Sequence, residues 1–366
     1  MEKAVWIIKR EPVLTVSFVL AAASAFFVPP DKEYLSYGNL PVLCLLLCLM
    51  VIVAGLRQAG LFDEMARRLT KRVRTEKGLL WVLCGECFFL SALITNDVAL
   101  ITFVPFTLLL LRGQPEKTVI FAVTMETVCA NLGSVLTPIG NPQNLYLYTY
   151  YHMAPGTFFA ATLPLGGLCV LLIAMTLLLR SDRKLPPFQT PGAAPLCRGE
   201  LAVYGALFAL CLLTVMNLLP CWAVFTVVTL TVWWRDKHLF AAVDYVLLGT
   251  FVCFFVFVGN AARIPWIHRM VSQWMTGREV LAGALLSQCI SNVPAAAMLS
   301  AFTEKGASLV VGTNIGGLGT LIASMASLIS YRQIREESTI RPGRYLLTFS
   351  AVNLLFLGIL LMVYGR

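Results

Sequence analysis

The residues best suited to chemistry in this sequence are acidic side chains set deep in apolar segments. Asp97 lies near the middle of residues 79–111, a block that contains no basic side chain. A carboxylate at such a depth in a membrane is costly and usually binds a cation or carries a proton. Glu86, in the same block, and Glu126, in the next apolar segment, are further candidates for proton coupling. The alternatives are a charged helix cap for Asp97 and buried, neutral side chains for both glutamates.

A second set of polar residues surrounds interruptions in the apolar pattern. Two are polar pairs inside apolar blocks, and two are stretches rich in Gly and Pro, at 133–142 and 312–320. Irregular backbone is not tolerated in lipid, so these segments must line a buried or water-filled cavity. The candidate substrate- or ion-binding residues are Thr95, Asn96, Asp97, Asn131, Gly133, Thr137, Gly140, Asn141, Ser291, Asn292, Asn314, Gly316 and Thr320.

Each interruption is expected to be followed by a new helix. The predicted N-caps are Asn96/Asp97 and Ser291/Asn292, with Pro138, Pro142 and Pro294 in first turns. Helix N-termini favour an anion or an oxygen-rich solute, whereas freed carbonyls and Asn, Ser or Thr side chains suit a small cation. The pattern alone therefore leaves the sign of the ligand open. The structural alternatives are close helix packing for the glycines and simple capping for the asparagines.

The elements that must position these residues are transmembrane helices. Of the 366 residues, 58% are hydrophobic and 13% are charged, with a mean hydropathy of +0.79, which excludes a soluble protein. Nine full spans are predicted, at 12–29, 38–57, 118–150, 157–179, 200–218, 220–234, 239–259, 307–331 and 345–365. The blocks 79–111 and 280–302 do not fit a single crossing. We interpret each as a re-entrant hairpin, the first with two arms of about 24 Å.

The distribution of basic residues supports this topology. With a cytoplasmic N-terminus, 22 Lys and Arg residues lie inside and 6 outside, as the positive-inside rule requires. The same distribution explains the net charge of +9 without invoking nucleic acid. Because the two hairpins then enter from opposite faces, the chain is predicted to consist of two inverted repeats, 1–190 and 191–366.

Residue patterns agree with a duplication. Ser91…Thr95-Asn96 matches Ser287…Ser291-Asn292 at an offset of 196, and Asn131 and its neighbours match Asn314 and its neighbours at an offset of 183. In this alignment the counterpart of Asp97 is Val293, so only the first half carries an acid. Inverted repeats with broken helices (118–150 and 307–331) are typical of secondary transporters.

Four motifs resemble the ion transporter superfamily, in its arsenite-permease and citrate-transporter-like branch, and especially the YbiR-like bacterial inner-membrane proteins. They are T-N-D-V-A-L (95–100), N-L-G-S-V-L-T-P-I-G-N-P-Q-N (131–144), S-N-V-P (291–294) and N-I-G-G-L-G-T (314–320). The resemblance implies a homodimer with elevator-like alternating access. Sodium-coupled relatives carry Ser-Asn-Thr at both hairpin tips. The changed third positions, Asp97 and Val293, favour proton coupling.

The sequence therefore predicts an all-α, multi-pass transporter of the bacterial inner membrane, embedded in the lipid bilayer. Its predicted cargo is an anion or small oxyacid, dicarboxylate- or arsenite-like, moved with protons. A Na⁺(Li⁺)/H⁺ antiporter is the alternative, and it would use sodium in place of an anionic cargo. No enzyme motif, metal site or cofactor is expected beyond the coupling ion.

Overall fold

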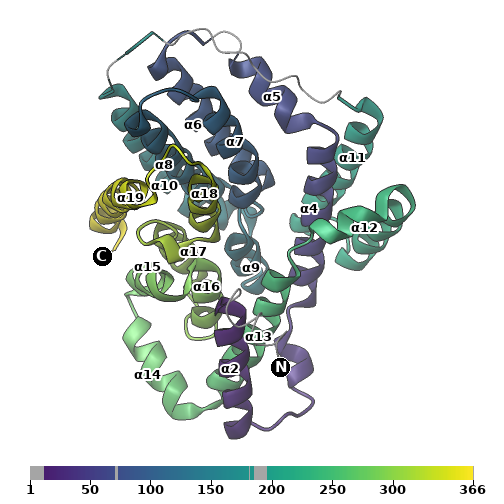
Figure 1. Ribbon diagram of the computed structural model, residues 1–366. Helices are drawn as coiled ribbons and strands as arrows, with labels where there is room; N and C mark the ends of the chain where they lie inside the picture. Colours follow the sequence, from purple (N-terminus) through teal and green to yellow (C-terminus); the bar gives the residue numbers. More distant parts are fainter. Residues whose placement is uncertain (1–11, 71–72, 181, 185–195, 366) are drawn as a thin grey trace.

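The computed structural model describes residues 12–70, 73–180, 182–184 and 196–365, and its regular structure is helical (Figure 1). The first half contains α2 (Pro12–Phe27), α3 (Tyr34–Tyr37), α4 (Leu40–Gln58), α5 (Leu61–Thr70), α6 (Glu76–Ile94), α7 (Asn96–Leu110), α8 (Glu116–Gly133), η1 (Ser134–Leu136), α9 (Pro142–Tyr150) and α10 (Pro155–Leu178).

The second half contains α11 (Arg198–Val215), α12 (Cys221–Asp236), η2 (Lys237–Ala242), α13 (Tyr245–Arg263), α14 (Pro265–Met275), α15 (Glu279–Ile290), α16 (Asn292–Ser300), α17 (Gly306–Gly316), η3 (Leu321–Ala323), α18 (Met325–Glu336) and α19 (Pro342–Tyr364). The cytoplasmic N-terminus expected from the charge pattern falls on residues 1–11, outside the described part of the chain.

Seven of the described helices are long and apolar enough to cross a membrane, so the chain is a polytopic membrane protein. They are α4, α6, α8 (with η1), α10, α11, α13 and α19. The length of α6 differs from the expected arm of about 24 Å, because its 19 residues span about 28 Å. The difference arises at the N-terminus, where the Thr75 hydroxyl accepts a hydrogen bond from the Gly78 N–H (3.1 Å) and starts the helix before the apolar run.

Two long apolar segments are interrupted in the middle. Residues 116–150 run as α8, η1 and α9, and residues 306–336 run as α17, a short irregular segment, η3 and α18. Gly, Pro and Asn at these points end one helix and start the next: Asn141 caps α9 by accepting the Asn144 N–H (2.8 Å), and Pro142 occupies its first position.

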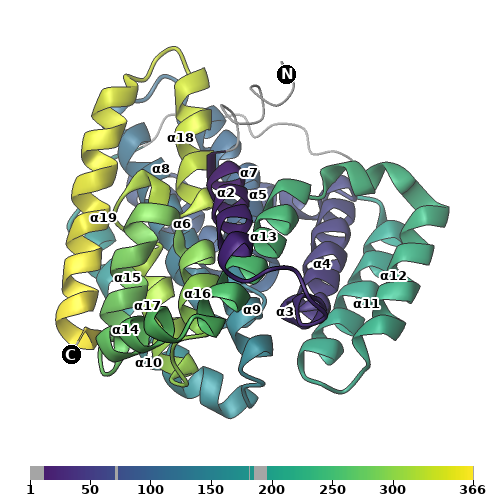
Figure 2. The same ribbon diagram turned by 90° about the horizontal axis from the view of Figure 1, so that it is seen from below.

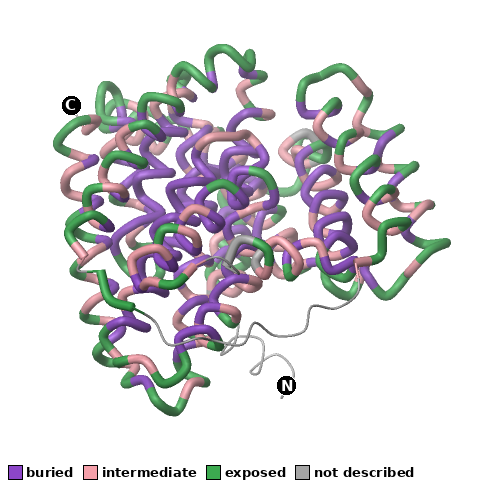
Figure 3. Tube along the Cα trace, turned by 90° about the horizontal axis from the view of Figure 1, so that it is seen from above, coloured by how far each residue is buried: buried purple, intermediate pink, exposed green. Residues whose placement is uncertain are grey.

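The helices form two groups that are visible in two views. Helices α4, α11 and α12 stand together on one side, and α6–α8, α10 and α15–α19 form the larger group (Figures 1 and 2). Buried residues concentrate inside the larger group, whereas α10, α11 and α19 expose most of their apolar side chains, as lipid-facing helices do (Figure 3). The interrupted helices therefore lie in the best-packed part of the molecule.

An ion pair outside the apolar segments fastens the loop after α2 to the end of α13. The Arg263 guanidinium donates to Asp31 Oδ2 (2.7 Å) and to the Tyr37 hydroxyl (2.9 Å). The hydrogen bond from Arg263 lowers the pKa of the Asp31 carboxyl below its ordinary value of 3.8.

Candidate functional site

In each of two helix pairs, a single residue with a strained backbone joins the two helices. Thr95 joins α6 to α7 with φ 89° and ψ 146°, and Ser291 joins α15 to α16 with φ 78° and ψ 153°. This region of backbone conformation is sparsely populated by residues other than glycine and costs about 1–3 kcal/mol for each. Strain of this kind persists where the surrounding structure fixes it, which is common at binding sites and switches.

The capping expected at these two junctions is partly wrong. The N-cap positions are Thr95 and Ser291 themselves, and neither side chain makes a capping hydrogen bond. Instead, the Asn96 side-chain oxygen accepts from the Asp97 N–H (3.0 Å). Pro294 lies in the first turn of α16 as expected, but Pro138 lies in the irregular segment before α9.

Buried asparagines connect the two interrupted helices across the halves of the chain. The Asn141 amide donates to Asn314 Oδ1 (2.9 Å), and the Asn314 amide donates to Asn144 Oδ1 (2.6 Å). On the other side, Asn131 Oδ1 accepts from Ser324 Oγ (3.0 Å) and from the Asn96 amide (3.1 Å). The predicted residues Asn96, Asn131, Asn141 and Asn314 are thus brought into one region.

Two of the three predicted glycines, Gly133 and Gly316, lie where helices pack closely. A side chain at Gly133 would lie 2.5 Å from Ser91 Oγ and meet the Phe88 carbonyl, and one at Gly316 would lie 2.6 Å from Ser287 Oγ. These contacts put α8 against α6 and α17 against α15 at nearly backbone distance. Close packing therefore accounts for both glycines, and a binding role for them stays a prediction.

The remaining predicted residues make local contacts around the interruptions. Thr137 Oγ1 donates to the Ala92 carbonyl and Thr320 Oγ1 to the Gln288 carbonyl (3.1 Å). The Gly140 carbonyl accepts from the Asn96 N–H (3.1 Å). Ser291 and Asn292 are buried beside the second interruption, where Ser291 Oγ lies 3.4 Å from the Ala323 carbonyl oxygen.

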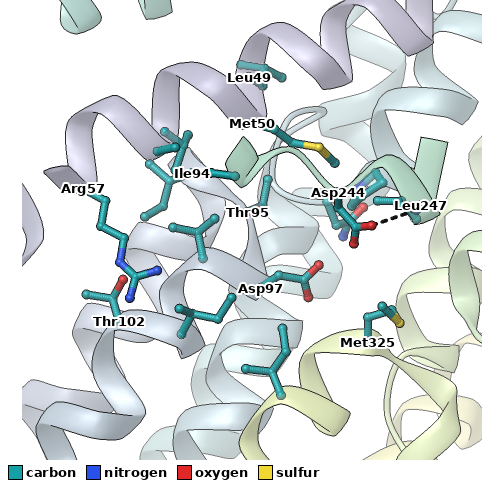
Figure 4. Close-up of a pocket in the computed structure, with 18 of the residues that line it drawn as sticks. Leu49, Met50, Arg57, Ile94, Thr95, Asp97, Thr102, Asp244, Leu247 and Met325 are labelled. Carbon is teal, nitrogen blue, oxygen red and sulfur yellow. Dashed lines mark hydrogen bonds between the residues drawn. The ribbon is translucent and has the colours of Figure 1, made fainter. Parts of the chain in front are cut away.

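A cavity of about 820 Å³ lies between α4, α7 and the start of α13 (Figure 4). Three of the predicted site residues line it, Thr95, Asp97 and Asn141, whereas the other buried asparagines of the network and Ser291 are not part of its wall. Most of the wall is apolar. Its polar residues are Arg57, Gln58, Asp63, Thr95, Asp97, Thr102, Asn141, His238 and Asp244.

Four helices begin at the wall of this cavity. Asp97 is in the first turn of α7, Pro142 and Met325 are the first residues of α9 and α18, and Asp244 caps α13 by accepting the Leu247 N–H (2.9 Å). A helix N-terminus carries partial positive charge, equivalent to about half an elementary charge. Acids compensate this charge on α7 and α13, whereas α9 and α18 have no acid in their first turns.

The Asp97 carboxylate projects into the cavity from the first turn of α7. Figure 4 shows Asp97 and Asp244 entering the same space from α7 and from the start of α13. Asp97 Oδ1 is shielded from solvent and has no hydrogen-bond partner among the residues that the structure describes. The guanidinium of Arg57 extends from α4 toward α7 in the same view, so the cavity holds charges of both signs.

Glu86 and Glu126 lie in the packed interior rather than on the cavity wall. Glu126 is fully buried, and its Oε1 accepts from the Thr107 hydroxyl (2.5 Å). Neither oxygen of Glu86, nor Oε2 of Glu126, has a partner within the described part of the chain.

Three residues of this region were missed by the sequence reasoning. Arg57 and Asp244 were not among the predicted site residues, and only long-range packing places them in the cavity with Asp97. Gln288, one turn before Ser291, binds the second interruption through its amide. A long polar side chain in an otherwise apolar arm was the available signal for Gln288.

Comparison with known proteins agrees with the resemblance drawn from the motifs. The family described as citrate transporter matches residues 4–307. An uncharacterised transporter of Methanocaldococcus jannaschii is 33% identical over 321 residues, 87% of each chain. The inner membrane protein YbiR of Escherichia coli is 29% identical over 318 residues, 86% of this chain and 85% of that one.

A more distant similarity covers part of the chain. The silicon efflux transporter LSI3 of Oryza sativa is 37% identical over 122 residues, 33% of this chain and 24% of that one. With the multi-pass helical architecture, these matches confirm the resemblance to the ion transporter superfamily and a transport rather than an enzymatic role. The chain belongs to the citrate transporter family of secondary transporters.

Proposed function

We propose that this protein moves an anion or small oxyacid, dicarboxylate- or arsenite-like, across a bacterial inner membrane together with protons. The observation that carries this proposal is the cavity among four helix N-termini, in which one Asp97 carboxylate oxygen has no partner among the described residues. The helix starts and Arg57 supply positive potential for the substrate, and Asp97 supplies a group that can bind and release a proton.

The positive potential favours an anionic or oxygen-rich cargo. The first turns of α9 and α18 lack acids, so their N–H groups can attract an oxyanion at the cavity wall. Citrate, named in the description of the family, is an anion of this kind.

Electrostatic repulsion between Asp97 and an anionic substrate couples proton binding to substrate binding. A substrate anion about 5 Å from an ionised Asp97 would be repelled by about 3 kcal/mol at an effective dielectric constant of about 20, which lowers affinity by roughly 100-fold. Protonation of Asp97 removes this repulsion. Anion and proton would therefore bind together, which is the requirement for symport. Glu86 and Glu126 are secondary candidates because neither lines the cavity.

We further propose that the two halves are inverted repeats, with α6/α7 and α15/α16 as re-entrant hairpins. Equivalent contacts recur at the two sequence offsets. The Asn131–Ser324 and Asn131–Ser327 contacts correspond, shifted by 183 residues in either direction, to the Asn314–Asn141 and Asn314–Asn144 contacts.

Contacts between the helix before each strained residue (α6 or α15) and the nearby interruption recur in the same way. Gly133 against Ser91 corresponds to Gly316 against Ser287, and Thr137 with Ala92 corresponds to Thr320 with Gln288. The matching strain at Thr95 and Ser291 supports the same pairing. The boundaries 1–190 and 191–366 and the homodimer implied by the family remain part of this proposal.

The alternative is a Na⁺(Li⁺)/H⁺ antiporter, and the pair of carboxylates Asp97 and Asp244 in one cavity favours it. Two carboxylates could exchange a sodium ion for protons without any anion.

Uptake of labelled candidates into proteoliposomes, followed by counterflow of the class that is taken up, tests the proposal. Citrate, succinate, phosphate and arsenite would be supplied in sodium-free buffer with an imposed pH gradient. We expect accumulation of one class that collapses with a protonophore. Sodium or lithium efflux driven by the pH gradient, with no response to any anion, would instead identify the antiporter.

A further inference from the structure

The side-chain amide of Gln288 occupies a pocket of carbonyl oxygens at the second interruption. Its Nε2 lies 2.9 Å from the Gly316 oxygen, 2.9 Å from the Leu318 oxygen and 3.1 Å from the Ala284 oxygen. Its Oε1 accepts the Thr320 N–H at 2.9 Å. One nitrogen is thus surrounded by three main-chain acceptors.

Convergent carbonyl oxygens at a broken helix are the usual ligands of a small coupling cation. Helix ends leave carbonyls without helical donors, and these must be satisfied by water, an ion or a side chain. At this interruption the neutral side-chain amide of Gln288 donates hydrogen bonds to such carbonyl oxygens. An amide nitrogen held among three oxygens stands where a cation would otherwise stand.

The first half lacks the equivalent side chain. With the offset of 196 that relates Ser91 to Ser287, the counterpart of Gln288 is Ala92. The main-chain contact is present at both positions, since Ala92 and Gln288 carbonyls each accept a threonine hydroxyl. Alanine has no amide to offer. The halves therefore differ twice: the first has Asp97 and no amide, and the second has Gln288 and Val293.

We propose that Gln288 is a specificity-determining residue whose amide replaces a coupling cation at the second interruption. The second half then binds no sodium, and ion coupling is confined to the half that contains Asp97. This inference deepens the proposed function and rests on it for the meaning of coupling. Whether the Gln288 amide excludes a cation can be measured without measuring transport.

The test replaces the donor by an acceptor of the same shape. Gln288→Glu would be made in the Asp97→Asn background, so that any cation response must arise away from Asp97. Thermal melting of the purified full chain would be recorded at pH 8 in NaCl, LiCl and choline chloride at equal ionic strength. The Asp97→Asn parent should melt at the same temperature in all three salts.

Gln288→Glu places a carboxylate against three carbonyl oxygens, so we expect sodium or lithium to stabilise it. The melting temperature should rise by roughly 2 °C for each tenfold increase in cation above the dissociation constant. Purification that succeeds only with sodium or lithium present would support the same conclusion. Gln288→Ala, which empties the pocket without adding charge, should show a smaller rise and decides the question if the glutamate variant cannot be purified.

Gln333→Glu is the matched control. The amide of Gln333 in α18 contacts a single carbonyl, that of Leu100, at 3.5 Å, so its glutamate variant should show no cation response. Two results would overturn the proposal: equal melting of both Gln288 variants in all salts, or a sodium-stabilised Asp97→Asn parent. Neither result bears on whether protons drive transport, so the proposed function is judged separately by flux.

Discussion

Replacing Gly133 with alanine would test the close approach that fixes the first interruption against α6. The added Cβ would lie 2.5 Å from Ser91 Oγ, 2.7 Å from the Phe88 carbonyl carbon and closer still to the Phe88 oxygen. The serine hydroxyl can rotate away, but the Phe88 carbonyl belongs to the α6 backbone and cannot.

The size of the effect follows from these distances. Ordinary van der Waals contacts begin near 3.4 Å, and the tightest contact here is 2.0 Å to the Phe88 oxygen, so α6 and α8 must separate by about 1.4 Å at Phe88. Overpacking of this kind costs about 1–3 kcal/mol. In a chain of this length the melting temperature should fall by roughly 1–4 °C. Because Asn131 is two residues away, the same movement should weaken its contact with Asn96 and slow transport.

Melting of the purified protein, followed by tryptophan fluorescence, measures this cost. Gly85→Ala is the matched control, since a side chain added at Gly85 in α6 meets nothing within 4 Å. That change should be neutral or stabilising, by up to about 1 kcal/mol, because alanine favours helix over glycine. If Gly133→Ala melts no lower than Gly85→Ala, the reasoning about close packing is refuted.

Three further changes probe the junction, the asparagine network and the loop ion pair. Thr95→Gly should raise the melting temperature, because glycine removes a backbone strain of about 1–3 kcal/mol; a lower melting temperature would show that Thr95 is not strained. Asn314→Ala should cost about 1–3 kcal/mol, because it removes the acceptor of one Asn141 N–H and the donor to Asn144 Oδ1. A double-mutant cycle with Asn141→Ala should show coupling, whereas simple additivity would exclude the contact. Arg263→Ala should melt below the wild type at pH 7, and the difference in melting temperature should shrink as the pH falls below about 3.8. The ion pair stabilises the fold only while the Asp31 carboxyl is ionised. A difference independent of pH would exclude the ion pair as its cause.

The interruptions could be predicted from sequence because their causes are local. Gly, Pro and Asn at 133–142 and 312–320 end and restart helices by their own conformational preferences. The position of Asp97 followed from the same reasoning, because a polar triplet inside an apolar block has few other uses in lipid.

The cavity could not be predicted, because it depends on contacts between residues far apart in sequence. Arg57 ends an apolar helix and Asp244 begins one, and both patterns are common at a membrane border. Only the packing of α4 and α13 beside α7 turns them into neighbours of Asp97. The role of Gly133 was likewise hidden, since sequence cannot distinguish a glycine that binds from one that packs.

Helix starts were predicted wrongly where a capping interaction, rather than hydropathy, decides the first residue of the helix. The start of α6 lies in a charged segment, and hydropathy alone places it three residues later than Glu76. The Thr75 cap compensates for the polar first turn. At Thr95 and Ser291 the expected side-chain caps gave way to strained backbone, which propensity cannot foresee.

The central claim is that Asp97 carries the proton that accompanies the substrate. Proton movement into proteoliposomes, followed with a lumenal pH dye during a pulse of the substrate identified by counterflow, tests it most directly. Asp244→Asn is the matched control, because asparagine retains the capping contact with Leu247. The account predicts substrate-dependent acidification in the wild type and in Asp244→Asn, and its loss in Asp97→Asn. Unchanged acidification in Asp97→Asn would contradict the account and reduce Asp97 to a charged residue of the first helical turn.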